Sequence, residues 1–427
     1  MVGIFPNLYY TVASYSPVTT FISFEALKAK DWQAALGQST NWKHAEIRGI
    51  IHHETRHYVD HLSTLWGQTN LLSLYKAMNA RLSLNETRFS EIINYKKQER
   101  ELHFADYYHE LYNGYVWRKG TANWDYRFSS GFRYRDDGSS DDTRPIMFVR
   151  FFTSDGLSLS RVPVSIASLF ETNAVFQEVD VMGKYIASQV SNKELDKFNS
   201  WLMGSLIYNN DRTIYNVAGH ICANLLDIKD PREAFPICSS LATLTLNLPH
   251  KLVEMLPLRD DELKVWNSRP RDMLRNHEHG FVFFNLLNNY KEKYRSVKRF
   301  NLQDLLAENG LPTEQEIAEM VRVELINLTR CYNEENLQRY FLDLHQKGLE
   351  LFNLRGIDGS GYDISKILAS TYIPNIRFAD SKNGSRFKEL FDVFKEMPLT
   401  DITHEDFFQI ATLTDERMDS LFQIRGI

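Results

Sequence analysis

The sequence predicts an α+β protein that is predominantly α-helical, and three observations support this fold class. Apolar residues recur at helical spacing over much of the chain, and over nearly all of it after residue 199. Short runs rich in β-branched and aromatic residues occur in residues 1–40 and around Gly156, which indicates a few strands. The 427 residues, 43% hydrophobic and 24% charged, are enough to bury a large core.

The length of the chain also predicts more than one domain. We place a boundary near residue 296, in the basic stretch "KEKYRSVKRF". Residues 1–295 would then form the domain that carries the strands, and residues 296–427 a helical C-terminal domain.

In the first third of the chain, residues 1–40 are expected to supply one or two strands. A long helix should begin at Asn41 as its N-cap and end near Gly67, and a second helix should span residues 84–115. Residues 118–145 are dense in Gly, Ser and Asp and have no sustained period, which predicts a long, exposed and mobile surface loop.

In the rest of the chain, the runs "IMFVRFF" and "LSLSRVPV" on either side of Gly156 predict a β-hairpin. A helix from Ser165 to Gln189 should follow. Thr313 and Glu316 fit a capping box at the start of a C-terminal helix. In "FKELFDVF", residues 387–394, the apolar side chains share one helical face.

Composition excludes several classes of function. A net charge of −6 without a long Lys/Arg run does not favour nucleic acid or an anionic membrane as a partner. Cys222, Cys238 and Cys331 are far apart and form no CxxC, which argues against a thiolate zinc site and favours a reducing compartment. No basic residue precedes Lys28 and no apolar run is long enough to span a membrane, so we expect a cytoplasmic protein.

The segment "GIIHHETRHYVDHLSTLWG" contains an HExxH motif formed by His53, Glu54 and His57. Residues four apart on a helix share one face, so both imidazoles can bind a single zinc ion. Glu54 lies to the side of that face and can act as a general base toward a water that zinc activates. A chance match in a chain with 13 histidines is the alternative, with the histidines on a solvated polar face.

A catalytic zinc ion has three protein ligands and one open position, so a third ligand must come from elsewhere. Glu171, Ala174 and Glu178 share one face of the helix predicted after Ser165, and Glu171 is the best candidate. Glu178, one turn away from the others, could then accept the free N–H of a ligand histidine.

Other interpretations of these residues stay open. Ser168 and Glu171 also fit a capping box, in which Glu171 would bond to the backbone instead of a metal. The rival third ligands are Glu178, Asp180 and the two histidines of "HEH", His277 and His279.

An HExxH motif followed by a helix bearing ExxA resembles the gluzincin zinc metallopeptidases, especially the compact intracellular ones. The resemblance covers only these two helices. It implies a zincin-like core in residues 1–295, with His53, His57 and Glu171 as zinc ligands and Glu54 as the base. The long interval between His57 and Glu171, and Val175 where thermolysin-like enzymes have an acidic residue, depart from that pattern.

Hydrolysis also needs a group that stabilises the developing oxyanion. Tyr208, Tyr215 and His220 follow the second helix, and we take Tyr215 and His220 as the leading candidates. The sequence therefore predicts a cytoplasmic zinc metallopeptidase that cleaves a protein or peptide. The alternatives are a helical interaction protein with an inert or structural metal site, and a zinc hydrolase of a non-peptide amide.

Overall fold

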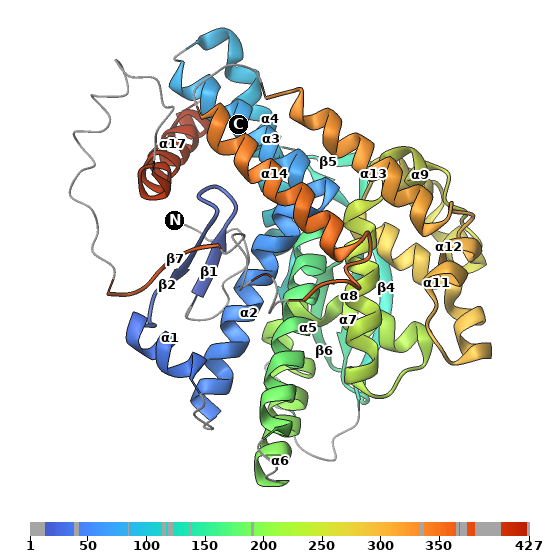
Figure 1. The fold of residues 1–427 in the computed structure, drawn as a ribbon. Helices are drawn as coiled ribbons and strands as arrows, with labels where there is room; N and C mark the ends of the chain where they lie inside the picture. Colours follow the sequence, from blue (N-terminus) through green and yellow to red (C-terminus); the bar gives the residue numbers. More distant parts are fainter. Residues whose placement is uncertain are drawn as a thin grey trace.

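A computed structural model of the chain describes residues 13–37, 42–83, 85–112, 117, 123–135, 138–188, 192–332, 337–363, 367, 374–380 and 403–424. Within these ranges the protein is predominantly helical with two small sheets (Figure 1), which confirms the predicted α+β class. The zincin-like core stays a prediction.

The helices and strands follow one another along the chain with these bounds. They are β1 (Ala13–Ser16), β2 (Phe21–Phe24), α1 (Ala29–Leu36), α2 (Trp42–Ser63), α3 (Leu65–Leu82), η1 (Glu86–Arg88), α4 (Phe89–Tyr108), β3 (Glu110–Leu111), β4 (Asp125–Tyr134), β5 (Ser140–Phe152), β6 (Ser158–Pro163), α5 (Ile166–Ala187), α6 (Asn192–Trp201), the π-helix η2 (Leu202–Ile207), η3 (Asn210–Arg212), α7 (Thr213–Leu226), α8 (Pro231–Asn247), α9 (His250–Glu254), η4 (Asp261–Trp266), α10 (Arg269–Arg275), α11 (His279–Val297), α12 (Leu302–Glu308), α13 (Glu314–Thr329), α14 (Gln338–Arg355), β7 (Asn375–Arg377) and α17 (His404–Ile424).

Helices α2 and α5 lie side by side at the centre of the molecule and run antiparallel (Figure 1). Near the start of α2, Gly49 lies against Glu178 and Met182 of α5. Further along α2, the ring of His57 stacks on that of Phe170, near the start of α5, with 6.4 Å between the ring centroids. A Cβ at position 49 would come within 2.9 Å of the Met182 sulfur, so this glycine lets the two helices approach closely.

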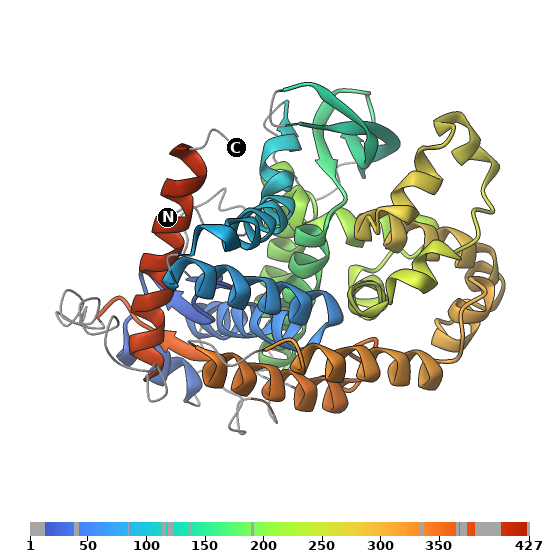
Figure 2. The ribbon, with the colours of Figure 1, turned by 90° about the horizontal axis from the view of Figure 1, so that it is seen from above.

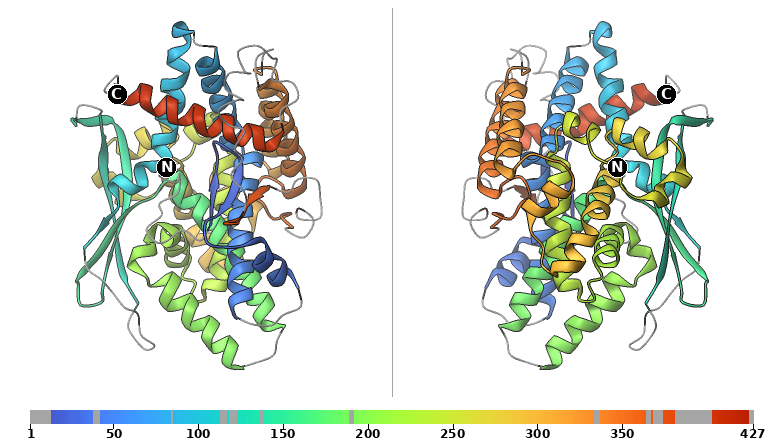
Figure 3. Two further views of the ribbon diagram at one scale, coloured as in Figure 1. Left: turned by 90° about the vertical axis from the view of Figure 1, so that its left-hand side faces the viewer. Right: turned by 90° about the vertical axis from the view of Figure 1, so that its right-hand side faces the viewer.

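The helices around this pair come from distant parts of the chain. Figure 2 shows α13 and α14 along one side of the helical layer, with α17 across its end. Figure 3 shows the four-stranded sheet on the opposite side of the layer from α14. Its strand order is β3-β6-β5-β4, whereas β1, β2 and β7 form a second sheet in which β2 and β7 pair in parallel.

The predicted loop at residues 118–145 is wrong where the structure describes it. β4 pairs with β5 antiparallel, from Asp125 opposite Phe152 to Tyr134 opposite Ser140. Aromatic side chains occupy four of the five alternate positions in "YRFSSGFRY", with Ser130 at the fifth, and this is the period of a strand. Of the Gly, Ser and Asp residues that suggested a loop, Ser129, Ser130 and Gly131 lie within β4 itself. Gly138, with a φ of 80°, lies in the connection between β4 and β5.

Several predicted boundaries also change. Helix α2 ends at Ser63, not near Gly67, because Thr64 caps a new helix, α3, by accepting a hydrogen bond from the Gly67 N–H. Helix α4 is shorter than the predicted 84–115. The predicted hairpin around Gly156 and the capping box of Thr313 and Glu316 are confirmed. Asn41 and residues 387–394 lie outside the described residues.

The helix predicted from Ser165 is confirmed as α5, but its capping box differs from the one considered above. Ser165 is the N-cap, and its partner in the capping box is Ser168. Glu171 is therefore not used as a cap, and its carboxylate is available for another role.

Buried apolar side chains form two large clusters. One contains Leu169 of α5 together with Ile317 of α13, and the other contains Tyr15 of β1 together with Met418 of α17. Each cluster therefore draws on residues from both sides of position 296, while the division into two domains stays a prediction. Among the described helices, none is long and apolar enough to cross a membrane.

Candidate metal centre

The structure brings His53 and His57 of α2 together with Glu171 of α5. The Nε2 atoms of the two histidines are 3.2 Å apart. The Glu171 Oε2 atom lies 3.3 Å from the His53 Nε2 and 3.6 Å from the His57 Nε2. His57 and Glu171 are each 1% exposed, so the three groups meet in the interior between the two helices.

These distances fit a shared tetrahedral ion. With bonds of about 2.0–2.1 Å, two ligand atoms on a tetrahedral zinc ion lie about 3.3 Å apart. Two imidazole nitrogens and one carboxylate oxygen are donors that zinc accepts, and three protein ligands leave its fourth position open. The distances between the three donor atoms are therefore those expected around one tetrahedral zinc ion, which the sequence alone could not show.

The electrostatics of the three groups also favour a positive charge between them. Burial raises the pKa of the Glu171 carboxyl, but the charges and hydrogen bonds of His57 and His53 outweigh burial and lower that pKa. Burial lowers the pKa of His53, but its hydrogen bonds to Glu171 and Glu178 outweigh burial and raise that pKa. A buried carboxylate requires a partner of opposite charge, which a cation held by these three groups would supply.

Glu178 contacts the other nitrogen of His53. Its Oε2 atom lies 3.2 Å from the His53 Nδ1. When Nδ1 donates its proton to this carboxylate, the Nε2 lone pair points toward His57 and Glu171, in the tautomer that metal binding needs. Glu178 therefore has the supporting position that the sequence predicted, and it does not join the cluster. Asp180 forms an ion pair with Lys184 at 2.6 Å instead.

Glu54 lies beside the three clustered residues and is only 7% exposed. Burial raises the pKa of its carboxyl, and the nearby His53 and His57 act in the opposite direction. The backbone N–H of Tyr15 donates a hydrogen bond to Glu54, so strand β1 fixes the carboxylate. No sequence pattern indicates this contact, because a backbone donor can come from any residue type except proline.

Of the oxyanion candidates, Tyr215 is the one that lies near the cluster. Its ring centroid is 6.3 Å from that of His53. Burial raises the pKa of its hydroxyl, and the carboxylates of Glu171 and Glu54 add to this effect, so Tyr215 stays a hydrogen-bond donor.

His220 and Tyr208 pack on each other and on Trp124, and a role for them in oxyanion stabilisation stays a prediction. His220 packs on the rings of Trp124, Phe151 and Tyr208, and its Nε2 atom lies 3.0 Å from the Ile207 carbonyl oxygen. His220 follows Tyr215 by five residues on α7, which turns its side chain about 140° around the helix axis.

The histidines of the "HEH" segment form a separate group. The rings of His277 and His279 stack with centroids 4.3 Å apart, and the ring of His250 lies 5.4 Å from that of His277. They are therefore not the third ligand. A second set of close carboxylates, Glu99, Asp415 and Asp419, surrounds the Lys96 ammonium at 2.6–2.8 Å, and this cation already occupies the position between them.

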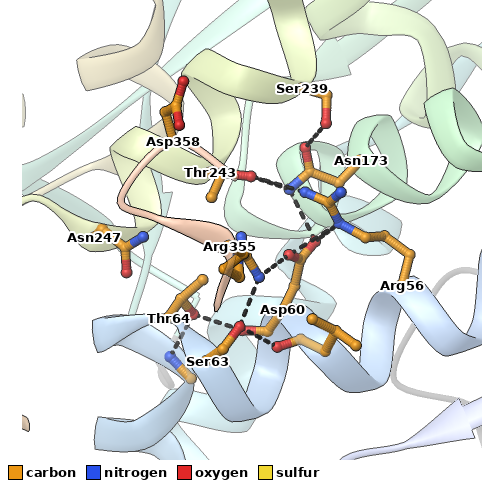
Figure 4. A network of polar contacts seen from close by, with 12 residues as sticks. Arg56, Asp60, Ser63, Thr64, Asn173, Ser239, Thr243, Asn247, Arg355 and Asp358 are labelled. Atoms are coloured by element: carbon orange, nitrogen blue, oxygen red, sulfur yellow. Dashed lines mark hydrogen bonds and ion pairs between the residues drawn. The ribbon is translucent and has the colours of Figure 1, made fainter. Parts of the chain in front are cut away.

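A buried ionic network that was not predicted from the sequence lies on α2 and α5 next to the cluster residues (Figure 4). Asp60, one turn after His57, accepts hydrogen bonds from Arg56 at 3.0 Å and from Arg355 at 2.6 Å. Asn173, two residues after Glu171, donates to the same carboxylate at 2.8 Å. The i, i+4 spacing of Arg56 and Asp60 was visible in the sequence, but it is equally common on solvated helix faces.

Comparison of the chain with protein-family models, with curated proteins and with solved structures gives no match.

Proposed function

We propose that the chain is a zinc-dependent metallopeptidase of the gluzincin type that cleaves a protein or peptide in the cytoplasm. The observation that carries the proposal is the approach of His53, His57 and Glu171 to within 3.6 Å of one another at ligand atoms, with Glu54 beside them. Cys222 and Cys238 are buried free thiols, which suits a reducing compartment.

Each residue has a separate role in the proposed reaction. His53, His57 and Glu171 would hold the ion, which supplies a Lewis acid for the scissile carbonyl and lowers the pKa of water. Glu54 accepts the proton of the attacking water and then passes it to the leaving amine. Tyr215 donates its hydroxyl proton in a hydrogen bond to the oxygen that becomes negative.

The experiment compares Glu54→Gln with the wild-type protein in zinc content and in cleavage of a library of proteome-derived peptides. The amide cannot accept a proton at neutral pH, so we expect cleavage to fall about 10²–10⁴-fold. Zinc should stay near one equivalent, because Glu54 is not among the ligands. Elemental analysis measures the zinc, and mass spectrometry identifies the fragments.

Two further variants serve as controls. His57→Ala removes a ligand and should lose the ion together with activity. His52→Gln changes a histidine on the same helix that lies outside the cluster, and it should retain both. A wild-type protein that binds no zinc, or a Glu54→Gln protein that cleaves as fast as wild type, would show that the chain is not a metallopeptidase of this kind.

A further inference from the structure

A second candidate site lies between the π-helix η2, helix α7 and the start of α8. A cavity of about 120 Å³ opens there, and its lining includes Trp124, Tyr208, Asn216, His220 and Phe235. None of the clustered residues His53, His57 and Glu171 lines it. The inference drawn from this cavity is independent of the proposed peptidase activity.

The walls of the cavity are aromatic. The His220 imidazole stacks on the Trp124 indole with an angle of 18° between the rings and 5.6 Å between their centroids. Tyr208 meets both of these rings edge-on. Flat side chains arranged in this way favour contact with a planar ligand.

The floor of the cavity carries hydrogen-bond acceptors. Asn216 and His220, one turn apart on α7, both donate to carbonyl oxygens at the end of the π-helix: the Asn216 Nδ2 to Leu206 and the His220 Nε2 to Ile207. A carbonyl can only accept, so these contacts fix the orientation of the amide and the tautomer of the imidazole.

These contacts leave Asn216 Oδ1 as an acceptor without a hydrogen-bond partner among the described residues, although Asn216 is only 1% exposed. Burial lowers the pKa of His220, which keeps the imidazole neutral, so with its Nε2 donating to Ile207 its Nδ1 has the character of an acceptor. A buried acceptor without a partner is unfavourable, and a ligand with an N–H group would satisfy it. π-helices themselves are often found at functional sites.

We propose that this cavity binds a planar heteroaromatic ring that donates an N–H group. The ring lies against this group of aromatic side chains, and its N–H donates to Asn216 Oδ1. A larger ligand extends through the mouth of the cavity, where Asn224 and Lys229 lie. Such a ring can belong to a free heterocycle or to a tryptophan side chain of a peptide.

Calorimetric titration of the full-length protein with indole tests the proposal. We expect a Kd of about 1 mM for this small probe. Benzofuran has the same shape with an oxygen in place of the N–H, and it should bind about tenfold more weakly or less. Ala223→Leu, which places a larger side chain on the cavity wall, should abolish indole binding.

A second ligand distinguishes the two possible sources of the ring. Binding of N-acetyl-tryptophanamide as tight as that of indole would assign the site to a peptide side chain, and binding of indole alone to a free heterocycle. The proposal is overturned by absence of indole binding, by equal binding of benzofuran, or by unchanged indole binding in Ala223→Leu. Zinc content, measured on the same samples, should be equal in wild type and Ala223→Leu, so failure here is distinguishable from failure of the peptidase proposal.

Discussion

At the scale of single residues, the two ring nitrogens of His53 have different partners, and this difference sets the tautomer of the ring. We predict that Glu178→Gln weakens zinc binding about 10–100-fold, because the neutral amide orients and polarises the imidazole less strongly than the carboxylate. Competition with a chelator of known affinity measures the change. Asp180→Asn is the matched control on the same helix, since Asp180 contacts Lys184 instead of the cluster. Equal losses in both variants would contradict a specific role for Glu178.

His61 is a buried histidine with a structural role. Its Nδ1 atom lies 2.8 Å from the Tyr15 hydroxyl and its Nε2 atom 3.1 Å from the Asn70 Oδ1. Burial lowers the pKa of His61 from 6.5 to about 4. The unfolded chain therefore takes up a proton at a higher pH than the folded chain does. The stability contributed by the neutral ring is complete above pH 6.5 and is lost as the pH falls toward 4.

We predict that His61→Gln reduces the loss of stability between pH 7 and pH 4.5. At about 1.4 kcal/mol per pKa unit, the difference from wild type should reach up to about 3 kcal/mol. Urea denaturation of the metal-free proteins at both pH values measures it, so that release of zinc in acid does not contribute. Parallel pH dependences in the two proteins would show that His61 does not titrate as its burial implies.

At the scale of elements, the sequence predicted those helices and strands whose signal lies in neighbouring residues. The HExxH face of α2, the β5–β6 hairpin and the start of α5 follow from side-chain period and capping, and all three elements are present. At β4 the composition predicted a loop, because the strand itself contains Ser129, Ser130 and Gly131. Gly67 led to a wrong end for α2, because a glycine after a helix indicates a C-cap. This glycine instead lies in α3, where it permits close packing against the His61 backbone.

We predict that Gly67→Ala destabilises the protein by about 4 kcal/mol or more. A Cβ at this position would lie 1.9 Å from the carbonyl oxygen of His61, so the backbone at the junction of α2 and α3 must move. Gly183→Ala within α5 is the control, since its Cβ would meet only the Phe198 ring, at 3.4 Å. The control should be neutral or more stable by about 0.5–1 kcal/mol. Thermal unfolding compares the two, and similar melting temperatures would contradict close packing at Gly67.

At the scale of the whole molecule, the candidate metal centre depends on parts of the chain that no local pattern connects. Tyr15 of β1 holds Glu54, and Arg355, at the end of α14, holds Asp60 one turn beyond His57. Contacts between residues so far apart in sequence leave no spacing to detect. The helical C-terminal region thus supports the helix that carries the histidines (Figure 4).

Arg355 gives this dependence a quantitative test. Its Nη1 atom donates to Asp60 at 2.6 Å and to Ser63 at 2.7 Å, and the side chain is 2% exposed. Arg355→Met removes both hydrogen bonds and leaves the buried Asp60 with Arg56 as its remaining cation among the described residues. Removal of one partner of a buried ion pair costs about 3–5 kcal/mol, and we expect the lower end because Arg56 still neutralises Asp60.

Arg259→Met provides the matched control, because Arg259 is 49% exposed in its ion pair with Glu308 and an exposed pair contributes about 0–1 kcal/mol. Urea denaturation of the two variants at neutral pH gives both free energies of unfolding. Asp60 lies on the helix that carries both histidines, so Arg355→Met should also lower the affinity for zinc, whereas Arg259→Met should not. If both variants unfold at the same urea concentration, the contact between α14 and α2 contributes little, and the histidine helix is stabilised by its apolar packing alone.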